Sequence, residues 1–154
     1  MRPAEAGDVD LLYTWSNDPE VRAQSFSGKT IEYEEHTRWF ARKLASNDAR
    51  IMIALDEEAP AAVVRFERSA GECTVSITVA KEYRGKGWAT EILRKALKRM
   101  RAEQFCGVAT AYIKHRNPAS LKAFHSAGFK QIENTELGRF PESAKLVFDL
   151  SSCK

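Results

Sequence analysis

The chain has 154 residues, of which 44% are hydrophobic and 29% charged, and its formal net charge is +3. This composition is typical of one globular domain with a substantial core, so we expect a single domain over residues 1–154. The basic excess is smaller than in most nucleic-acid-binding domains, and no apolar run is long enough to span a membrane. We therefore expect neither a nucleic-acid nor a membrane partner. No signal-peptide pattern opens the chain, which favours a cytoplasmic location.

The three cysteines, Cys73, Cys106 and Cys153, show no Cys-x-x-Cys spacing. An odd number of cysteines without that spacing argues against a disulfide framework and against a zinc site. We therefore expect Cys73 and Cys106 to act as small core residues, and we expect no bound metal.

Two helices are expected at the amino-terminal end. Residues 8–17 form an amphipathic segment, and the Asn-Asp-Pro sequence at 17–19 then turns the chain. Thr30 can cap a second helix that runs to about residue 46. The apolar face of this second helix is predicted to contain Tyr33, Phe40 and Leu44, with Trp39 near its edge.

Three strands follow. Residues 50–55 and 61–68 are strand candidates joined by a turn at 56–60, and a second turn at 69–72 leads to the third strand. That strand, residues 73–79, alternates apolar residues with serine and threonine, which is the pattern of a half-buried strand. A long amphipathic helix follows, with a basic outer face between residues 94 and 101.

The junction between this strand and helix, residues 79–90, is the most informative segment of the chain. Gly85 and Gly87 remove side chains that would keep a ligand away from the backbone, and Arg84 and Lys86 add positive charge. A helix start also presents unpaired N–H groups and the positive end of the helix dipole. The junction therefore predicts an anion site, for phosphate above all.

The last third of the chain predicts a strand, a short helix and a hairpin. The strand covers residues 108–113, and Asn117 or Ser120 can cap the helix that Gly128 ends. Residues 130–137 and 144–150 suggest a closing hairpin.

Two motifs in this order resemble those of the GNAT superfamily of N-acetyltransferases. Arg84-x-x-Gly87-x-Ala89 resembles the family's acyl-CoA pyrophosphate loop, Gln/Arg-x-x-Gly-x-Gly/Ala. Residues 117–129 resemble a later family segment, Asn-x-x-Ala/Ser followed by an aromatic residue and Gly-Phe. The chain contains neither the nucleotide P-loop pattern nor the dinucleotide-binding Gly-x-Gly-x-x-Gly.

The resemblance covers almost the whole chain and implies an α/β (α+β) fold. Its sheet is mixed and mostly antiparallel, is flanked by about four helices, and has strands splayed apart at the acyl-CoA site. The family's first strand would need several residues before Arg2, so either that strand is short or the chain is related to a longer fusion protein. The implied co-substrate is acetyl-CoA. By position, the residues implied to bind it are Ile77, Thr78, Val79, Arg84, Gly85, Lys86, Gly87, Trp88, Ala89, Thr90, Asn117, Ser120 and Phe124.

The family's chemistry implies that an amine attacks the thioester carbonyl, with the backbone N–H of Val79 stabilising the oxyanion. A base must deprotonate the ammonium. The candidates are His36, which ranks first, then Glu72 and His115, with Tyr112 in addition. Many relatives place a tyrosine seven residues after the motif asparagine, where this chain has Phe124. A thiolate that leaves unprotonated forgoes about 2 kcal/mol, so transfer is still possible. The missing tyrosine also favours an alternative, a non-catalytic domain that only binds acetyl-CoA.

The acceptor is suggested by residues 15–26 and 35–40. They resemble the GNAT subgroup that acetylates nucleotide-linked amino sugars in pseudaminic acid biosynthesis, and are also similar to ribosomal-protein N-terminal acetyltransferases. The preferred acceptor is therefore a small-molecule amine, a nucleotide-linked amino sugar, and a protein N-terminus is the alternative. The implied acceptor-binding residues are Trp15, Arg22, Phe26, His36 and Trp39.

Each of these residues also has a structural explanation, core packing for the aromatic residues and a solvated charge for Arg22. A nucleic-acid-binding module is supported only by the basic face at residues 94–101, which a solvated helix explains better. We expect a monomer or a homodimer.

Overall fold

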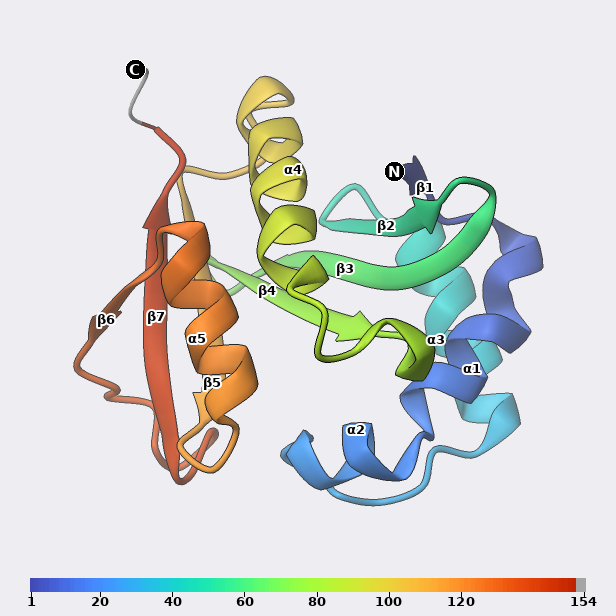
Figure 1. The fold of residues 1–154 in the computed structure, drawn as a ribbon, viewed down its shortest axis with the longest axis horizontal. Helices are drawn as coiled ribbons and strands as arrows, with labels where there is room; N and C mark the ends of the chain where they lie inside the picture. The colour runs from blue at the N-terminus through green and yellow to red at the C-terminus, as the bar shows by residue number, and fades with distance from the viewer. Residues whose placement is uncertain (152–154) are drawn as a thin grey trace.

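A computed structural model describes residues 1–151 as an open sheet of seven strands in the order β1-β2-β3-β4-β5-β7-β6 (Figure 1). Every neighbouring pair is antiparallel except β4–β5, which is parallel. The mixed, mostly antiparallel sheet predicted from the sequence is confirmed. The strands are β1 (Arg2–Pro3), β2 (Ala49–Asp56), β3 (Ala59–Ser69), β4 (Glu72–Val79), β5 (Val108–Lys114), β6 (Lys130–Ile132) and β7 (Ser143–Asp149).

Helices cover both faces of the sheet (Figure 1). α4 and α5 pack on one face of the sheet, mainly over β4, β5 and β7. α1 and α3 pack on the opposite face, over β1, β2 and β3. The first strand is indeed short, with only two residues. The helices are η1 (Ala6–Asp8), α1 (Val9–Ser16), α2 (Pro19–Gln24), α3 (Tyr33–Ala45), η2 (Lys81–Tyr83), α4 (Trp88–Ala102) and α5 (Pro118–Ala127).

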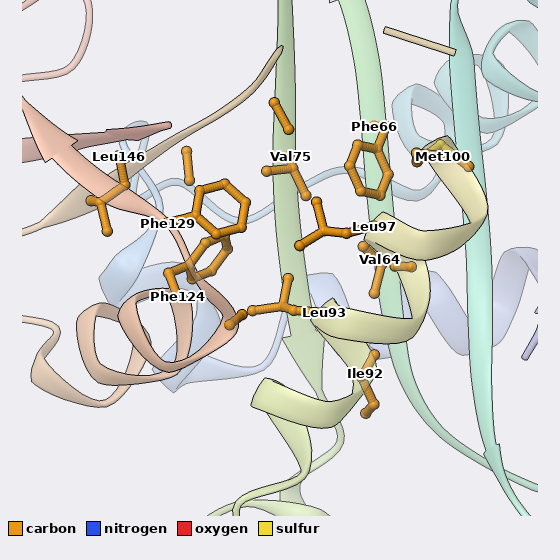
Figure 2. Packing of buried hydrophobic residues seen from close by; sticks show 14 of the residues in the cluster. Val64, Phe66, Val75, Ile92, Leu93, Leu97, Met100, Phe124, Phe129 and Leu146 are labelled. Carbon is orange, nitrogen blue, oxygen red and sulfur yellow. The ribbon is translucent and has the colours of Figure 1, made fainter. Parts of the chain in front are cut away.

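The central strand β3 contributes side chains to two cores because its residues alternate between faces. Val63 packs with α1 and α3, whereas Val64 and Phe66 pack under α4. Figure 2 shows Leu93 and Leu97 of α4 pointing into this second core, and both are almost fully buried. Burying a leucine contributes roughly 1.5–3 kcal/mol, so these contacts fix the start of α4 beside the end of β4.

The Asn-Asp-Pro segment begins a short helix, α2, where the sequence suggested only a turn. Asp18 accepts a hydrogen bond from the backbone N–H of Glu20 at 2.9 Å, and Pro19 occupies the first helical turn. Both are standard signals of a helix start, so α2 was predictable from the residues alone.

The predicted start of α3 is wrong, and its predicted buried face is right for Phe40 and Trp39 but wrong for Tyr33 and Leu44. The helix begins at Tyr33 after Glu32, so Thr30 does not cap it. Tyr33 and Leu44 are 45% and 37% exposed, whereas His36 and Phe40 are buried. The inward position of a histidine is possible because its Nε2 hydrogen-bonds the carbonyl of Val9 at 2.9 Å. That partner lies in another helix, so the sequence pattern alone did not place His36 on the buried face.

The closing hairpin has a shorter first strand than predicted. β6 ends at Ile132, and residues 133–142 form a long loop before β7. The side chain of Asn134 donates to the carbonyl and the hydroxyl of Ser143, at 3.1 and 2.9 Å, which anchors this loop. Within the loop, Phe140 stacks on Tyr112 of β5 with ring centroids 4.0 Å apart. The loop therefore forms part of a surface beside β5.

Cys73 is buried in the core under α4, and Cys106 packs against the same core, as expected; neither is in a disulfide. Cys153 lies outside the described residues. Within residues 1–151, no group of three His, Cys, Asp or Glu side chains is placed to hold a metal ion. None of the helices in this part of the chain has the length and apolarity needed to cross a bilayer.

We expect Asp8→Asn to destabilise the amino-terminal end of the sheet at neutral pH. Asp8 is 8% exposed and accepts hydrogen bonds from both terminal nitrogens of Arg2, at 2.7 and 2.8 Å, and from the amide of Glu5. Hydrogen bonds to charged groups contribute about 1.5–3 kcal/mol, and we expect a loss of that order.

The loss of stability in Asp8→Asn should depend on pH, and the pKa of Asp8 sets the sign of that dependence. The hydrogen bonds from Arg2 hold the pKa of the Asp8 carboxyl below its ordinary value. A lowered carboxyl pKa adds stability above the unfolded-state pKa, and that stability is lost as pH falls through the folded-state pKa. Urea unfolding at about pH 7 and about pH 3 should therefore show a gap between wild type and variant that narrows at low pH. An equal gap at both pH values would contradict the assignment.

Candidate active site

β4 and β5 are joined at a single residue pair, Thr74 with Thr110, and diverge beyond it (Figure 1). The family resemblance predicted such a splay at this strand, and the structure confirms it. The divergence opens toward the end of β4 that leads into the glycine-containing loop.

The backbone of β4 presents free edge groups toward this opening. In an antiparallel ladder, alternate residues direct their N–H and C=O groups to the same neighbour. The amide of Ala80 bonds to β3, at 2.8 Å from the carbonyl of Ala61, so the amides of Ile77 and Val79 are directed away from β3. The amide of Thr78 is directed toward β3. This geometry places the predicted oxyanion donor, the N–H of Val79, on the side of the opening.

The loop after β4 is suited to an anion. Gly85 and Gly87 have φ values of +73° and +77°, which disfavour any residue with a side chain. A Cβ at either position would meet no atom within 4 Å, so the space over the backbone is open. Gly87 is the N-cap of α4, and no side chain caps the helix, which leaves the amides of its first turn available. The first turn holds Trp88, Ala89 and Thr90. The residues present therefore fit the pyrophosphate of an acyl-CoA.

The side chain of Arg84 has a different role from the one predicted. Its Nε donates to the carbonyl of Val79 at 2.9 Å, and its Nη1 lies 2.9 Å from the carboxylate of Glu20 and 3.4 Å from that of Asp18. The guanidinium is therefore engaged with α2. Lys86, in contrast, is exposed beside Tyr83, and its ammonium group lies at the surface of the loop.

α2 lies across the wide end of the opening and contacts both sides of it (Figure 1). On the β4 side it meets Arg84, as described. On the β5 side, Lys114 donates to the carbonyls of Ala23 and Ser25, at 3.2 and 2.9 Å, and Arg116 also donates to the carbonyl of Ala23. α2 is thus held at the opening by residues at or just after the ends of β4 and β5.

The later motif lies at the start of α5. Asn117 is the N-cap, and its side chain accepts a hydrogen bond from the amide of Ser120 at 3.3 Å. Phe124 is only 3% exposed and packs edge-on against Phe129, as Figure 2 shows. Asn117 and Ser120 are half-buried and accessible to a ligand, whereas Phe124 offers a co-substrate almost no surface.

An acceptor pocket of about 550 Å³ lies beside β4. Its wall combines α2, α3, two central strands, β5 and the 133–142 loop, segments far apart in the sequence. We name it the acceptor pocket. Its lining residues are Ser16, Arg22, Phe26, Ser27, Ile31, Glu35, His36, Trp39, Arg42, Arg65, Glu67, Thr74, Val75, Ser76, Tyr112, Arg139 and Phe140.

Four of the five predicted acceptor residues line this pocket, namely Arg22, Phe26, His36 and Trp39. Arg22 is engaged within the protein, because its guanidinium donates to the carbonyls of Ser16 and Lys29 and to the hydroxyl of Ser25. Burial lowers its pKa, consistent with a bracing role inside the loop. Trp15, the fifth residue, packs against the core under α3 and does not line the pocket.

The two candidate histidines lie in contrasting places. His36 is 2% exposed, and its Nε2 is occupied by the carbonyl of Val9, so only its other ring nitrogen is free of that bond. His115 is exposed at the end of β5 and lines neither this pocket nor the neighbouring one under α2. His36 therefore lines the pocket with one ring nitrogen already engaged, and His115 lies outside it.

Glu72 and Tyr112 form a pair beside the acceptor pocket. The hydroxyl of Tyr112, which lines the pocket, donates to the carboxylate of Glu72 at 2.6 Å. Lys145 of β7 lies 3.6 Å from the same carboxylate. Burial, followed by the hydrogen bond to Glu72, raises the pKa of Tyr112. Tyr112 is therefore a neutral phenol at physiological pH that is hydrogen-bonded to a carboxylate.

The pocket residues that sequence reasoning missed include three arginines, Arg42, Arg65 and Arg139. Arg65 left a signal, because it interrupts the otherwise apolar run of a strand that is buried on both faces. Arg42 and Arg139 left none: one is an ordinary charged helix residue and the other lies in a loop.

Comparison with known proteins agrees with this geometry. Residues 1–130 match the family described as the acetyltransferase (GNAT) domain. The chain is 32% identical over 131 residues to an uncharacterized N-acetyltransferase, YfmK, of Bacillus subtilis, covering 84% of this chain and 82% of that protein.

Two solved structures share the fold. One is AAC(6')-Ib in complex with paromomycin and acetyl-CoA, with a TM-score of 0.82, 14% identity, and coverage of 96% of this chain and 91% of that one. The other is spermidine N-acetyltransferase of Vibrio cholerae in complex with CoA and spermine, with a TM-score of 0.82, 16% identity, and coverage of 97% and 94%. With the glycine loop and the open edge of β4, these matches show that the chain belongs to the GNAT family and is an acetyl-CoA-dependent N-acetyltransferase.

Proposed function

We propose that the protein transfers the acetyl group of acetyl-CoA to the primary amine of a small molecule held in the acceptor pocket. The supporting observation is the continuity of β4. Its middle residues Thr74, Val75 and Ser76 line the acceptor pocket, and its end leads into the anion-binding loop. An amine in the pocket and a thioester at the open edge would therefore meet along one strand, as direct transfer requires.

The residues of the chain divide the chemistry between them. Acetyl-CoA supplies the thioester carbonyl that the amine attacks. The N–H of Val79 is the donor for the developing oxyanion, and that of Ile77 lies on the same edge. Asn117 and Ser120, with the loop from Gly85 to Thr90, hold the CoA moiety in this proposal.

Glu72 accepts the proton of the ammonium through Tyr112. As the hydroxyl of Tyr112 takes the ammonium proton, it passes its own proton to the carboxylate of Glu72, with which it shares a 2.6 Å hydrogen bond. The products of this step are a neutral amine, an unchanged phenol and a neutral Glu72. The amine then forms the C–N bond, the C–S bond breaks, and the sulfur leaves as a thiolate. The second proton, which the nitrogen loses as the amide forms, passes to water.

The acceptor that we propose is a nucleotide-linked amino sugar. Phe26, Trp39 and Phe140 line the pocket and offer aromatic faces to a base or a sugar ring. The pocket volume of about 550 Å³ falls in the range of ordinary small-molecule sites. An amine on a sugar ring is less basic than an alkyl amine, so a weak base such as the Glu72 carboxylate suffices to deprotonate its ammonium form.

Thiol release tests this proposal. Purified protein with acetyl-CoA is offered UDP-linked amino sugars, aminoglycosides, spermidine and amino-terminal peptides, and free CoA is measured over time. We expect turnover with the amino-sugar nucleotides. Turnover of peptides alone would instead identify a protein N-terminal acetyltransferase. Binding of acetyl-CoA without thiol release from any amine would identify a non-catalytic domain.

A further inference from the structure

We propose that Arg65 forms an anion subsite in the acceptor pocket, so that the natural acceptor is an amine that also bears a phosphate or a carboxylate. This inference rests on the proposed function, because it concerns the same pocket. An anionic acceptor would distinguish this chain from its structural neighbours, whose complexes contain spermine or an aminoglycoside, both of them polycations.

Arg65 occupies a central position in the sheet. It extends from β3 toward α3, and its guanidinium carbon lies 5.2 Å from the ring centroid of Trp39. Arginine stacked on an aromatic face keeps its donor edges free for a planar or tetrahedral anion. Trp39 thus holds the guanidinium in place without using its hydrogen-bonding capacity.

No hydrogen bond or ion pair within residues 1–151 engages the guanidinium of Arg65. Its nearest acidic neighbour along the strand, Glu67, is paired with Lys43 at 3.3 Å. Burial lowers the pKa of Arg65, which reflects the cost of placing this cation away from water. Half-buried charges in proteins are normally paired, so an unpaired one facing a pocket indicates that a ligand completes it.

Most of the charged side chains around Arg65 are also positive. The acceptor pocket is lined by four arginines and two glutamates. The guanidinium groups of Arg42 and Arg139 also make no hydrogen bond or ion pair within the described residues. Of the two glutamates, Glu67 is already paired with Lys43, which leaves Glu35. The neighbouring pocket under α2 shares Arg22 and adds Lys114 and Arg116, with no acidic residue in its lining.

Charge complementarity then selects the acceptor class. A polycation would place its ammonium groups against this basic wall, and like-charge contacts in a half-buried site are unfavourable. An amine with a phosphate or carboxylate would pair with Arg65 through charge-assisted hydrogen bonds, which bind more strongly than neutral ones.

The test compares acceptors that differ only in charge. In the phosphate pair, glucosamine is compared with a glucosamine phosphate. In the carboxylate pair, an amino sugar is compared with its carboxylate analogue. For wild type, kcat/KM should be higher with the anionic member of at least one pair. Arg65→Gln should lower kcat/KM for that member about 10- to 100-fold and change the neutral amine by less than about twofold.

Arg38→Gln is the matched control, since Arg38 lies on the exposed side of α3 and does not line the pocket. It removes one positive charge from the same region and should leave both members of each pair unchanged. A second readout avoids turnover: in CoA-saturated protein, the melting temperature should rise with the anionic amine in wild type and not in Arg65→Gln.

The outcomes separate this inference from the proposed function. Equal losses for neutral and anionic amines in Arg65→Gln, or a wild-type preference for spermidine, would overturn the anion subsite and leave acetyl transfer standing. Absence of thiol release from every amine would overturn the proposed function instead, and the melting-temperature comparison would still decide whether Arg65 binds an anion.

Discussion

Gly87→Glu abolishes the stabilisation by acetyl-CoA that wild-type protein shows in a thermal unfolding experiment; this is the result that we expect. At an acetyl-CoA concentration about 100 times Kd, a bound ligand stabilises the native state by about 2.7 kcal/mol. For a chain of this size, that corresponds to a rise in melting temperature of roughly 5–10 °C. The variant should show no rise.

The physical reason lies in the backbone of the loop. Gly87 has a φ of +77°, and the space next to it is open. A glutamate there strains the backbone, fills the space over the first amides of α4, and brings a negative charge to the position of the phosphates. Each effect opposes binding of the CoA pyrophosphate.

Gly71→Glu is the matched control for the strain itself. Gly71 has a φ of +78° in the turn before β4, and a Cβ there would also meet no atom within 4 Å. This variant should lose a similar amount of stability and should still respond to acetyl-CoA. If Gly87→Glu responds as wild type does, the loop is not the phosphate site.

Glu72→Gln and Tyr112→Phe should each lower kcat at about pH 7 by roughly 10²–10⁴, the usual contribution of a positioned proton acceptor. Tyr112→Phe removes only the hydroxyl and keeps the ring that stacks on Phe140. Glu72→Gln keeps a hydrogen-bond acceptor for Tyr112 but removes the negative charge that takes the proton. Binding of acetyl-CoA should be unchanged in both variants.

The pH profile distinguishes proton transfer from a structural role. Above the pKa of the acceptor, the amine is already neutral and needs no base before it attacks, so the deficit of both variants should shrink as pH rises. The charged groups that face the pair are Lys145, Glu136 and Arg139. Glu136→Gln, which removes a negative charge near Tyr112 without touching its hydrogen bond, serves as the control and should behave as wild type. A deficit that is constant with pH would exclude the relay.

The co-substrate half of the site was predictable because it depends on backbone conformation that short motifs specify. Gly85 and Gly87 fix positive φ angles, and the alternation of residues 73–79 fixes which amides of β4 face each neighbour. Both properties are local, so the sequence reports them directly. The side chain of Arg84 was misassigned for the opposite reason: its partners, Asp18 and Glu20, lie more than sixty residues earlier.

The acceptor half depends on contacts between distant segments. The inward face of α3 was predicted only in part, because His36 is satisfied by the carbonyl of Val9, a partner that no local pattern reveals. The pair formed by Glu72 and Tyr112 joins residues forty positions apart. Neither could be deduced from spacing along the chain.

The sequence by itself determined most of the secondary structure and, through two motifs that resemble those of the GNAT superfamily, the fold and the family, because glycine conformation, strand alternation and helix periodicity are properties of neighbouring residues. Only the tertiary structure decided which charges meet in the acceptor pocket. It engages Arg22 and Arg84 in bracing α2 and, among residues 1–151, leaves the guanidinium of Arg65 without a hydrogen bond or ion pair. Charge pairing depends on distance in space, and folding brings together groups that lie far apart in the sequence.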